Sequence, residues 1–535
     1  MKKYILLFVS FLMVVCYAHA QGKDGALGDV SVCQGYQTVG RNNGRALLLR
    51  IGISGTLPGA VLDKLAITLK GNTLSHIRSL EVCQTDSLEF YADPHPLSLG
   101  KTVPRKSRVE VPLKGYALHD GMNYLWLTAS LKSHAKLGEY VDAMLTKVVY
   151  SFQGELHEVD IPMEVGDPEG RAQIFDVQSF AYIPTTDHCR FYRIPAMILD
   201  RKGNIVVACD RRYDSNADLG NHKIDVSVRR SEDGGRTWSG QNVIAVGDGT
   251  TPSDFGYGDP ALARTKEGRL ICVMAAGSTM YWYGMRHAAI CLSDDNGRTW
   301  TRPRQLYASH FTDAVNGKVD DLGFHGNFIS SGKGLTTSDG TVMFTTNCLT
   351  YEDKRSPQCY ILSSKDEGES WTIGPANAYK GCDESKLEQL NDGRLMVSVR
   401  QGGDRGFNTG TADASRWDAQ WRNGDITGNA CNADILYYSR ATEGKKDIML
   451  HTYIKSDVRE NLTLAMSLDQ GVTWKDVLNI QPGGSCYSTM AKLVNGDLAI
   501  LYEDESYTVG NGYAINFVTV TRKQLLEFAR RCGLE

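Results

Sequence analysis

Two arginines stand inside apolar segments of this chain, where a charged side chain is costly unless it has a partner. Arg193 interrupts the apolar run 191–199, and Arg400 follows directly after the apolar segment 395–399. A structural pair with a nearby carboxylate is the simplest explanation for either one alone. Two such arginines together favour a functional role. Rigid guanidinium groups can hold a carboxylate through bidentate hydrogen bonds, which lysine does not reproduce.

An octet with the pattern S-x-D-x-G-x-[ST]-W predicts the turns that would position these arginines. It occurs four times, at residues 231–238, 293–300, 364–371 and 467–474. The pattern is typical of a hairpin turn in which Asp accepts backbone N–H groups, Gly takes a positive φ and Trp folds back over the turn. A calcium loop is not indicated, because the twelve-residue acidic ladder that ends in Glu is missing.

A second repeat, a turn glycine followed by an apolar strand, interleaves with the octets. The copies begin at Gly203, Gly268, Gly340, Gly393 and Gly496, with a weaker copy at Gly444. Spacings of 51 to 72 residues between successive glycines are typical of four-stranded propeller blades. Six such turns predict a six-bladed β-propeller over residues 176–535.

Residues 21–175 show alternating apolar runs without the octet and predict an antiparallel β-sandwich. The runs lie at 46–53, 108–112, 123–128 and 147–152. A turn-rich segment at 166–170 suits a domain boundary. The fold class is therefore all-β, and the one helix that we expect follows Thr521.

The first 20 residues have the order of a secretory signal: Lys2 and Lys3, an apolar run at 4–17, then Ala-His-Ala at 18–20. We expect export to the periplasm or the cell exterior and no transmembrane segment. Lipidation at Cys16 is the less favoured alternative. The other 12 cysteines form no C-x-x-C pair, so we expect mostly buried thiols and no metal site. A net charge of -4 without a basic block argues against nucleic-acid binding.

The motif Tyr192-Arg193-Ile194-Pro195, followed by the four octets, resembles the bacterial exo-α-sialidase (neuraminidase) family over residues 176–535. The resemblance implies that Arg193, Arg400 and Arg459 bind the carboxylate of sialic acid. It further implies that Arg212 and Asp259 line the sugar pocket, with Arg211 an alternative to Arg212.

The catalytic residues are likewise implied by the resemblance. Asp218 is the expected acid/base, and Tyr487 with Glu384 is the expected nucleophile pair. Glu388 competes with Glu384, but it falls in the strand-like segment 387–390 and is better interpreted as part of that strand's exposed face. The expected reaction is hydrolysis with retention of configuration and without a cofactor.

The expected substrates are sialylated oligosaccharides, glycoproteins and glycolipids, and the first domain is expected to be a carbohydrate-recognising or positioning module. Two alternatives stay open. A sialic-acid lectin on the same scaffold would keep the arginines and lose the acid or the nucleophile. A trans-sialidase would differ in how water is excluded, which motifs do not report.

Overall fold

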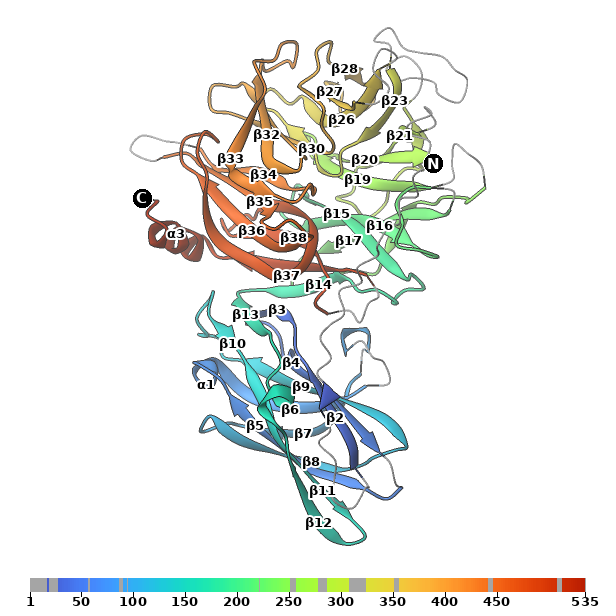
Figure 1. Cartoon of the computed structure of the whole chain (residues 1–535). Coiled ribbons are helices and arrows are strands. Elements are labelled where there is room, and N and C mark those ends of the chain that lie inside the picture. Colours follow the sequence, from blue (N-terminus) through green and yellow to red (C-terminus); the bar gives the residue numbers. More distant parts are fainter. Residues whose placement is uncertain are drawn as a thin grey trace, which may run out of the picture. The chain divides into compact units, whose positions relative to one another are not determined.

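The computed structural model (Figure 1) describes residues 17–18, 27–55, 58–85, 90–93, 95–220, 222–250, 256–277, 286–306, 324–350, 356–440, 446–507 and 512–534. The expected secretory signal at 1–20 and the weak glycine repeat at Gly444 lie largely or wholly outside these residues. Within them the chain divides into two compact units, Met1–Ile174 and Phe175–Glu535. Among the described helices, none has the length and apolar character needed to cross a membrane.

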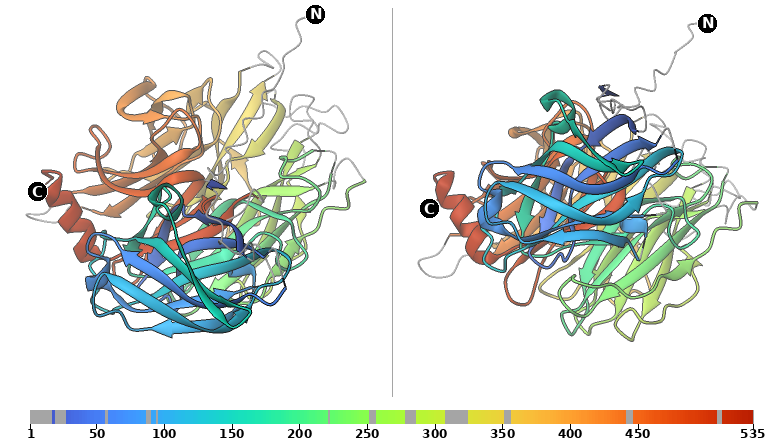
Figure 2. Two further views of the ribbon diagram at one scale, coloured as in Figure 1. Left: turned by 60° about the horizontal axis from the view of Figure 1, so that its bottom comes forward. Right: turned by 90° about the horizontal axis from the view of Figure 1, so that it is seen from below.

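The first unit is a β-sandwich, as the alternating apolar runs predicted. Its sheets have the strand orders β1-β2-β4-β9-β6-β7, β12-β11-β5-β8 and β10-β13-β3, and one continuous core lies within the unit. The strands can be followed in blue and teal in Figure 2. The elements are β1 (Tyr17–Ala18), β2 (Leu27–Cys33), β3 (Tyr36–Gly40), β4 (Ala46–Gly55), β5 (Val61–Leu69), α1 (Thr73–His76), β6 (Ile77–Gln84), η1 (Phe90–Ala92), β7 (Leu97–Thr102), β8 (Arg108–Ala117), β9 (Gly121–Leu131), β10 (Tyr140–Val141), β11 (Ala143–Phe152), β12 (Glu155–Asp160), α2 (Met163–Gly166) and β13 (Arg171–Phe175).

The second unit consists of antiparallel sheets whose strands follow one another along the chain. Its elements are β14 (Gln178–Tyr182), β15 (Phe191–Leu199), β16 (Ile205–Arg212), β17 (Ile224–Ser231), β18 (Asn242–Ala245), β19 (Tyr257–Arg264), β20 (Leu270–Gly277), β21 (Arg286–Ser293), β22 (Arg304–Gln305), β23 (Phe324–Ile329), β24 (Gly332–Lys333), β25 (Leu335–Thr336), β26 (Val342–Thr350), β27 (Gln358–Ser364), β28 (Thr372–Ile373), β29 (Tyr379–Lys380), β30 (Ser385–Gln389), β31 (Leu395–Val399), β32 (Gly403–Gly410), β33 (Trp421–Gly428), β34 (Asp434–Ser439), β35 (Ile448–Ile454), β36 (Glu460–Ser467), β37 (Lys475–Lys492), β38 (Leu498–Asp504), β39 (Ala514–Val520) and α3 (Arg522–Arg531).

Six four-stranded meanders can be traced through the described strands of this unit, and Figure 1 shows them set around a common centre. They are β15–β18, β19–β22, β23 with β26–β28, β30–β33, β34–β37, and β37–β39 with β14. The long strand β37 belongs to two of them, because its first half pairs with β36 and its second half with β38. The ring closes where β14, from the start of the unit, pairs with β39.

Each octet forms the hairpin turn between the third and fourth strand of its meander. The turn glycines Gly235, Gly297, Gly368 and Gly471 all have φ between 80° and 87°. The octet Asp accepts backbone N–H groups, as Asp295 does from Arg298 and Thr299. Three of the four tryptophans donate Nε1–H to the carbonyl of their own turn glycine. The exception is Trp238, which donates to Ser179 Oγ on β14.

The remaining details of the expected fold concern the helix and the thiols. Thr521 caps α3 by accepting the backbone N–H of Gln524, and α3 lies at the outer edge beside β37 (Figure 2). The 12 cysteines of the described residues are free thiols, and all except Cys33 and Cys532 are buried.

Candidate active site

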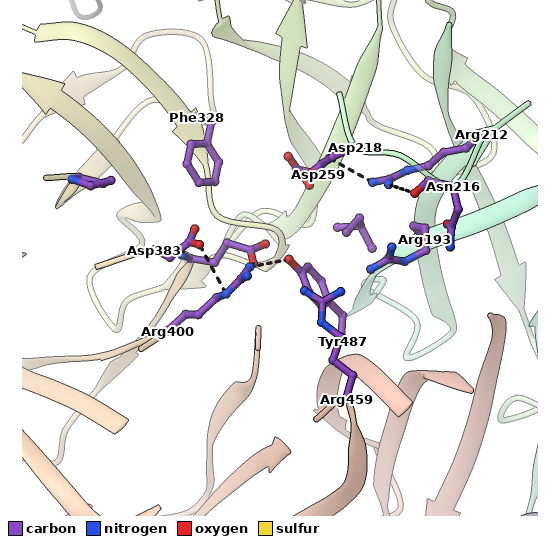
Figure 3. A pocket seen from close by; sticks show the side chains of 13 residues that line it. Arg193, Arg212, Asn216, Asp218, Asp259, Phe328, Asp383, Arg400, Arg459 and Tyr487 are labelled. Atoms are coloured by element: carbon purple, nitrogen blue, oxygen red, sulfur yellow. Dashed lines mark hydrogen bonds and ion pairs between the residues drawn. The ribbon is translucent and has the colours of Figure 1, made fainter. Parts of the chain in front are cut away.

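A cavity of about 420 Å³ in the second unit gathers every site residue predicted from the sequence (Figure 3). The lining residues are Arg193, Ile194, Arg212, Asn216, Asp218, Asp259, Phe328, Pro357, Asp383, Glu384, Arg400, Arg459 and Tyr487. They come from strands of the meanders and from the loops next to these strands. The propeller fold therefore brings together side chains that are far apart in the sequence.

Three guanidinium groups converge on the ring of Tyr487. The guanidinium carbons of Arg193, Arg400 and Arg459 lie 5.7, 5.9 and 5.8 Å from the ring centroid. They come from β15, from the residue after β31 and from the β35–β36 connection, while Tyr487 lies on β37. Three positive charges this close together repel one another, so the arrangement favours binding of an anion. The planar guanidinium groups can form bidentate hydrogen bonds, which suit a carboxylate.

Arg193 is also paired with a buried carboxylate, although not a local one. Its Nε and Nη2 donate to Oε1 and Oε2 of Glu503 on β38, at 2.7 and 3.3 Å. The Glu503 side chain is fully buried, and it also accepts the backbone N–H groups of Ile194 and Tyr487. Glu503 thus ties β15 to β37 and fixes Arg193 at the cavity wall.

We expect Glu503→Gln to lower the free energy of unfolding by about 3 kcal/mol, because it leaves a buried guanidinium without its counter-charge. Burial alone would raise the pKa of Glu503, but Arg193 and the backbone donors outweigh it and lower that pKa. The stabilisation by ionised Glu503 is therefore fully present at pH values above the ordinary pKa of glutamate. It is lost as the pH falls through the lowered pKa of Glu503. Chemical denaturation at several pH values measures it.

The control for this prediction is Glu527→Gln, which removes an exposed ion pair with Arg531 on α3. We expect that loss to stay below about 0.5 kcal/mol. A loss of the same size in both variants would contradict the role given to Glu503.

Arg400 links the predicted nucleophile pair. Its Nη1 donates to Glu384 Oε2 at 2.6 Å and to the Tyr487 hydroxyl at 2.8 Å, and its Nε donates to the Ala430 carbonyl. Burial and the neighbouring Glu384 raise the pKa of Tyr487 well above its usual value of 10. The phenol is therefore protonated at neutral pH, and an attack by its oxygen requires a base within reach.

A second cluster surrounds Arg212 on the opposite wall of the cavity (Figure 3). Its Nη2 donates to Asp210 Oδ2 at 2.7 Å and to Asp218 Oδ1 at 3.2 Å. Asp218 is the exposed member, with 63% of its side chain accessible, whereas Arg212 is buried. Of the two candidate arginines, Arg212 lines the cavity, and Arg211 donates to the Asp187 carbonyl instead.

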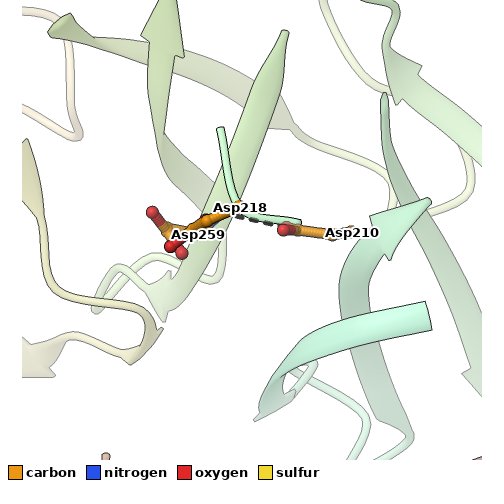
Figure 4. Close-up of side chains that lie close together, drawn as sticks. All are labelled: Asp210, Asp218 and Asp259. Carbon is orange, nitrogen blue, oxygen red and sulfur yellow. Dashed lines mark hydrogen bonds between the residues drawn. The ribbon is translucent and has the colours of Figure 1, made fainter. Parts of the chain in front are cut away.

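The carboxylates of Asp210, Asp218 and Asp259 lie within 4.8 Å of one another (Figure 4). Arg212 already supplies positive charge to two of them, and the backbone N–H of Asp259 donates to Asp210. The cluster is therefore a guanidinium–carboxylate network, in which Asp218 alone presents an exposed carboxylate to the cavity.

The interpretation of Glu388 as an exposed residue is wrong. Its side chain is buried and bonds to Lys333 Nζ at 3.1 Å, and all five residues of β30 are buried. Neighbouring sheets cover both faces of an inner propeller strand, so alternation between a buried and an exposed face does not apply there. Glu388 does not line the cavity, whereas Glu384 does.

Sequence reasoning missed Ile194, Asn216, Phe328, Pro357 and Asp383 as lining residues. One signal was available, because Tyr192–Ala196 and Tyr257–Ala261 share the pattern Y-x-x-P-A. Both segments contain a register shift, and Ile194 and Asp259 have φ of 59° and 53° just before the proline. Side chains other than Gly rarely adopt this conformation. The two bulges turn equivalent positions of neighbouring meanders into the cavity.

Comparison with known proteins agrees with this architecture. Residues 217–500 match the family described as BNR repeat-like domain, and residues 38–153 match the N-terminal domain of BNR-repeat neuraminidase. A sialidase of Bacteroides fragilis is 27% identical over 422 residues, which is 74% of this chain and 73% of that protein. A sialidase of Micromonospora viridifaciens is 28% identical over 333 residues, covering 58% of this chain and 50% of that protein.

Among solved structures, a Hadza microbial sialidase shares the fold with a TM-score of 0.65. The match is 24% identical and covers 92% of this chain and 99% of that one. Fold and site together define a β-propeller with an anion-binding cavity, of the kind built from BNR repeats. The chain belongs to the BNR-repeat neuraminidase family of bacterial sialidases. At the level of the family, this is a glycoside hydrolase that acts on sialic acid.

Proposed function

We propose that this protein removes terminal α-linked sialic acid from glycoconjugates by hydrolysis with retention of configuration. The observation that carries the proposal is the convergence of Arg193, Arg400 and Arg459 on the buried Tyr487. Sialic acid bears its carboxylate on the anomeric carbon. An anchor for that carboxylate beside a tyrosine hydroxyl would bring the hydroxyl oxygen to the carbon that is attacked.

In this mechanism Tyr487 attacks the anomeric carbon and gives its proton to Glu384. An attacking carboxylate would be repelled by the carboxylate of the substrate, whereas a phenol that is neutral until it attacks avoids this repulsion. Arg400, which bonds to both side chains, stabilises the negative charge during the transfer. The products of this step are a glycosyl–tyrosine intermediate and a protonated Glu384.

Asp218 is the proposed acid/base. Its exposed carboxylate lies across the cavity from Tyr487 and next to the guanidinium of Arg212 (Figure 3). It would protonate the departing glycosidic oxygen and then deprotonate the water that hydrolyses the intermediate, while Glu384 returns its proton to the departing oxygen of Tyr487. Two displacements at one carbon give net retention.

The experiment that tests the proposal is incubation of the protein with α2,3- and α2,6-sialyllactose, followed by proton NMR of the first product. Hydrolysis with retention gives free sialic acid as its α-anomer before mutarotation. Initial release of the β-anomer would overturn retention, and an anhydro sugar or a sialylated acceptor would indicate transglycosylation. Binding without any release would indicate a lectin.

A further inference from the structure

A set of buried polar side chains contacts Glu384 on the oxygen that Arg400 does not use. Ser331 Oγ donates to Glu384 Oε1 at 2.9 Å, and Asn432 Nδ2 donates to the same oxygen at 3.2 Å. Asn432 Nδ2 also bonds to Ser331 Oγ at 2.7 Å. Both residues are buried, and neither lines the cavity. One carboxylate oxygen is thus held from behind, and the other accepts from Arg400 Nη1, which also bonds to the Tyr487 hydroxyl.

Lys386 determines which way the Asn432 amide points. Its Nζ donates to Asn432 Oδ1 at 2.6 Å. An ammonium group has only donors, so it requires the amide oxygen on its side, and the amide NH₂ must then face Glu384. The reversed amide would place donors against a buried ammonium and an oxygen against a carboxylate. The lysine therefore fixes the donor that Glu384 receives.

The backbone leaves room for this lysine. Lys386 lies on β30, two residues after Glu384, and its side chain is fully buried. A Cβ on Gly332 would lie 2.8 Å from Lys386 Cε, and Gly332 has a φ of 105°. Both the space and the backbone conformation at this position require glycine.

A buried ammonium is expensive to keep, and burial lowers the pKa of Lys386 to about 8. The carboxylates that favour its charged form are Asp434 and Glu384, and Asp434 already lies 3.5 Å from Lys333. Lys386 bonds to a neutral amide, and among the described residues it forms no direct ion pair that an apolar side chain in its place would break. The stability of the fold therefore gives little reason for a charged side chain at Lys386.

We propose that Lys386 and Asn432 are positioning residues for Glu384: they orient its carboxylate so that it can accept the phenolic proton of Tyr487. This inference rests on the proposed function and goes beyond it by naming the residues behind Glu384 that set the orientation of its carboxylate. The charged and titratable groups that face Glu384 are Arg400, Asp383 and Tyr487 at the cavity, and Lys386 and Arg405 behind it.

The test is the pH profile of kcat/KM for the full chain, whose acidic limb reports the pKa of a base that must be ionised in the free enzyme. Asn432→Asp keeps the shape of the side chain but turns a carboxylate toward Glu384. We expect its acidic limb to move up by about one pH unit or more, because like charges raise a carboxyl pKa. Lys386→Met should move the limb in the same direction by about half a unit.

The control is Lys333→Met, which removes a largely buried ammonium, with 8% of its side chain exposed, that pairs with Glu388 rather than with Asn432. We expect it to lower thermal stability and to leave the acidic limb in place. Activity of both test variants should recover as the pH is raised above the shifted limb, which damage to the fold would not produce.

An unchanged limb in an active, folded Asn432→Asp enzyme would overturn the inference, and so would an equal shift in Lys333→Met. If Asn432→Asp does not fold, an unchanged acidic limb in an active Lys386→Met enzyme would overturn the inference. A parent enzyme that releases no sialic acid would instead refute the proposed function itself.

Discussion

Tyr487→Phe is expected to lower kcat for sialyllactose hydrolysis by about 10³-fold or more, because it removes the attacking oxygen. The ring, and with it the contacts to the three guanidinium groups, is kept. Binding of the substrate carboxylate should therefore persist, with KM changed by less than about threefold. Steady-state kinetics and binding of sialic acid by titration calorimetry separate the two effects.

The matched control is Tyr513→Phe. Tyr513 also packs against Arg193, with the guanidinium carbon 5.0 Å from its ring centroid, but it does not line the cavity. We expect its kcat to stay near that of the parent. Substantial turnover by Tyr487→Phe would show that another group, or water directly, attacks the anomeric carbon.

Asp218→Ala is expected to lower kcat/KM for sialyllactose by about 10³-fold, within the range for loss of a general acid. Lactose is a poor leaving group and needs a proton as the glycosidic bond breaks. A nitrophenyl or other acidic aryl leaving group does not, so the formation of the intermediate from such a sialoside should be nearly unaffected. Hydrolysis of the intermediate still lacks its base, so the covalent intermediate should accumulate. The phenol that forms together with it should appear as a burst.

Asp214→Ala is the control, because Asp214 lies in the same loop, is exposed and does not line the cavity. Pre-steady-state release of phenol and intact-protein mass spectrometry measure the burst and the covalent adduct. Equal losses on lactosides and aryl sialosides would assign Asp218 to substrate binding rather than to proton transfer.

The turns of the propeller were predictable because their hydrogen bonds are local. Within the octet, Asp295 accepts from residues three and four positions away, so the whole interaction is contained in the motif. One further turn was missed, because prediction depends on the motif and the motif of this turn is incomplete. Residues 411–417 read T-x-D-x-S-R-W without the glycine, yet Asp413 accepts from Thr411 and Ser415. These bonds, that of Thr411 foremost, lower the pKa of Asp413 to about 2.

The sequence contains no octet for the sixth meander, and the topology explains why. The octet joins the third strand of a meander to its fourth, but the strand beside β39 is β14, from the start of the unit. No chain connection exists at that place among the described strands. Trp238 of the first octet donates to Ser179 on β14 instead of to its own turn.

The supporting residues of the site could not be predicted, because they depend on contacts across the ring. Glu503 and Arg193 are 310 positions apart in the sequence, and the residues next to each of them do not indicate the pair. Lys386 lies in the strand Ser385–Gln389, where alternation with Leu387 would have assigned it to a solvated face. The cavity side chains themselves were recognised because the family resemblance supplied them residue by residue.

The pairing of β14 with β39 also sets the order in which the protein can fold. A hydrogen bond between the side chains of Gln178 and Asn516 joins positions 338 residues apart, so the last closure is a large loop. During synthesis the ring stays open until residues 514–520 have emerged, and until then both its first and its last strand expose unpaired edges. Such edges recruit strands of other chains. We therefore expect ring closure to be the slow step of folding, with aggregation as its competing outcome.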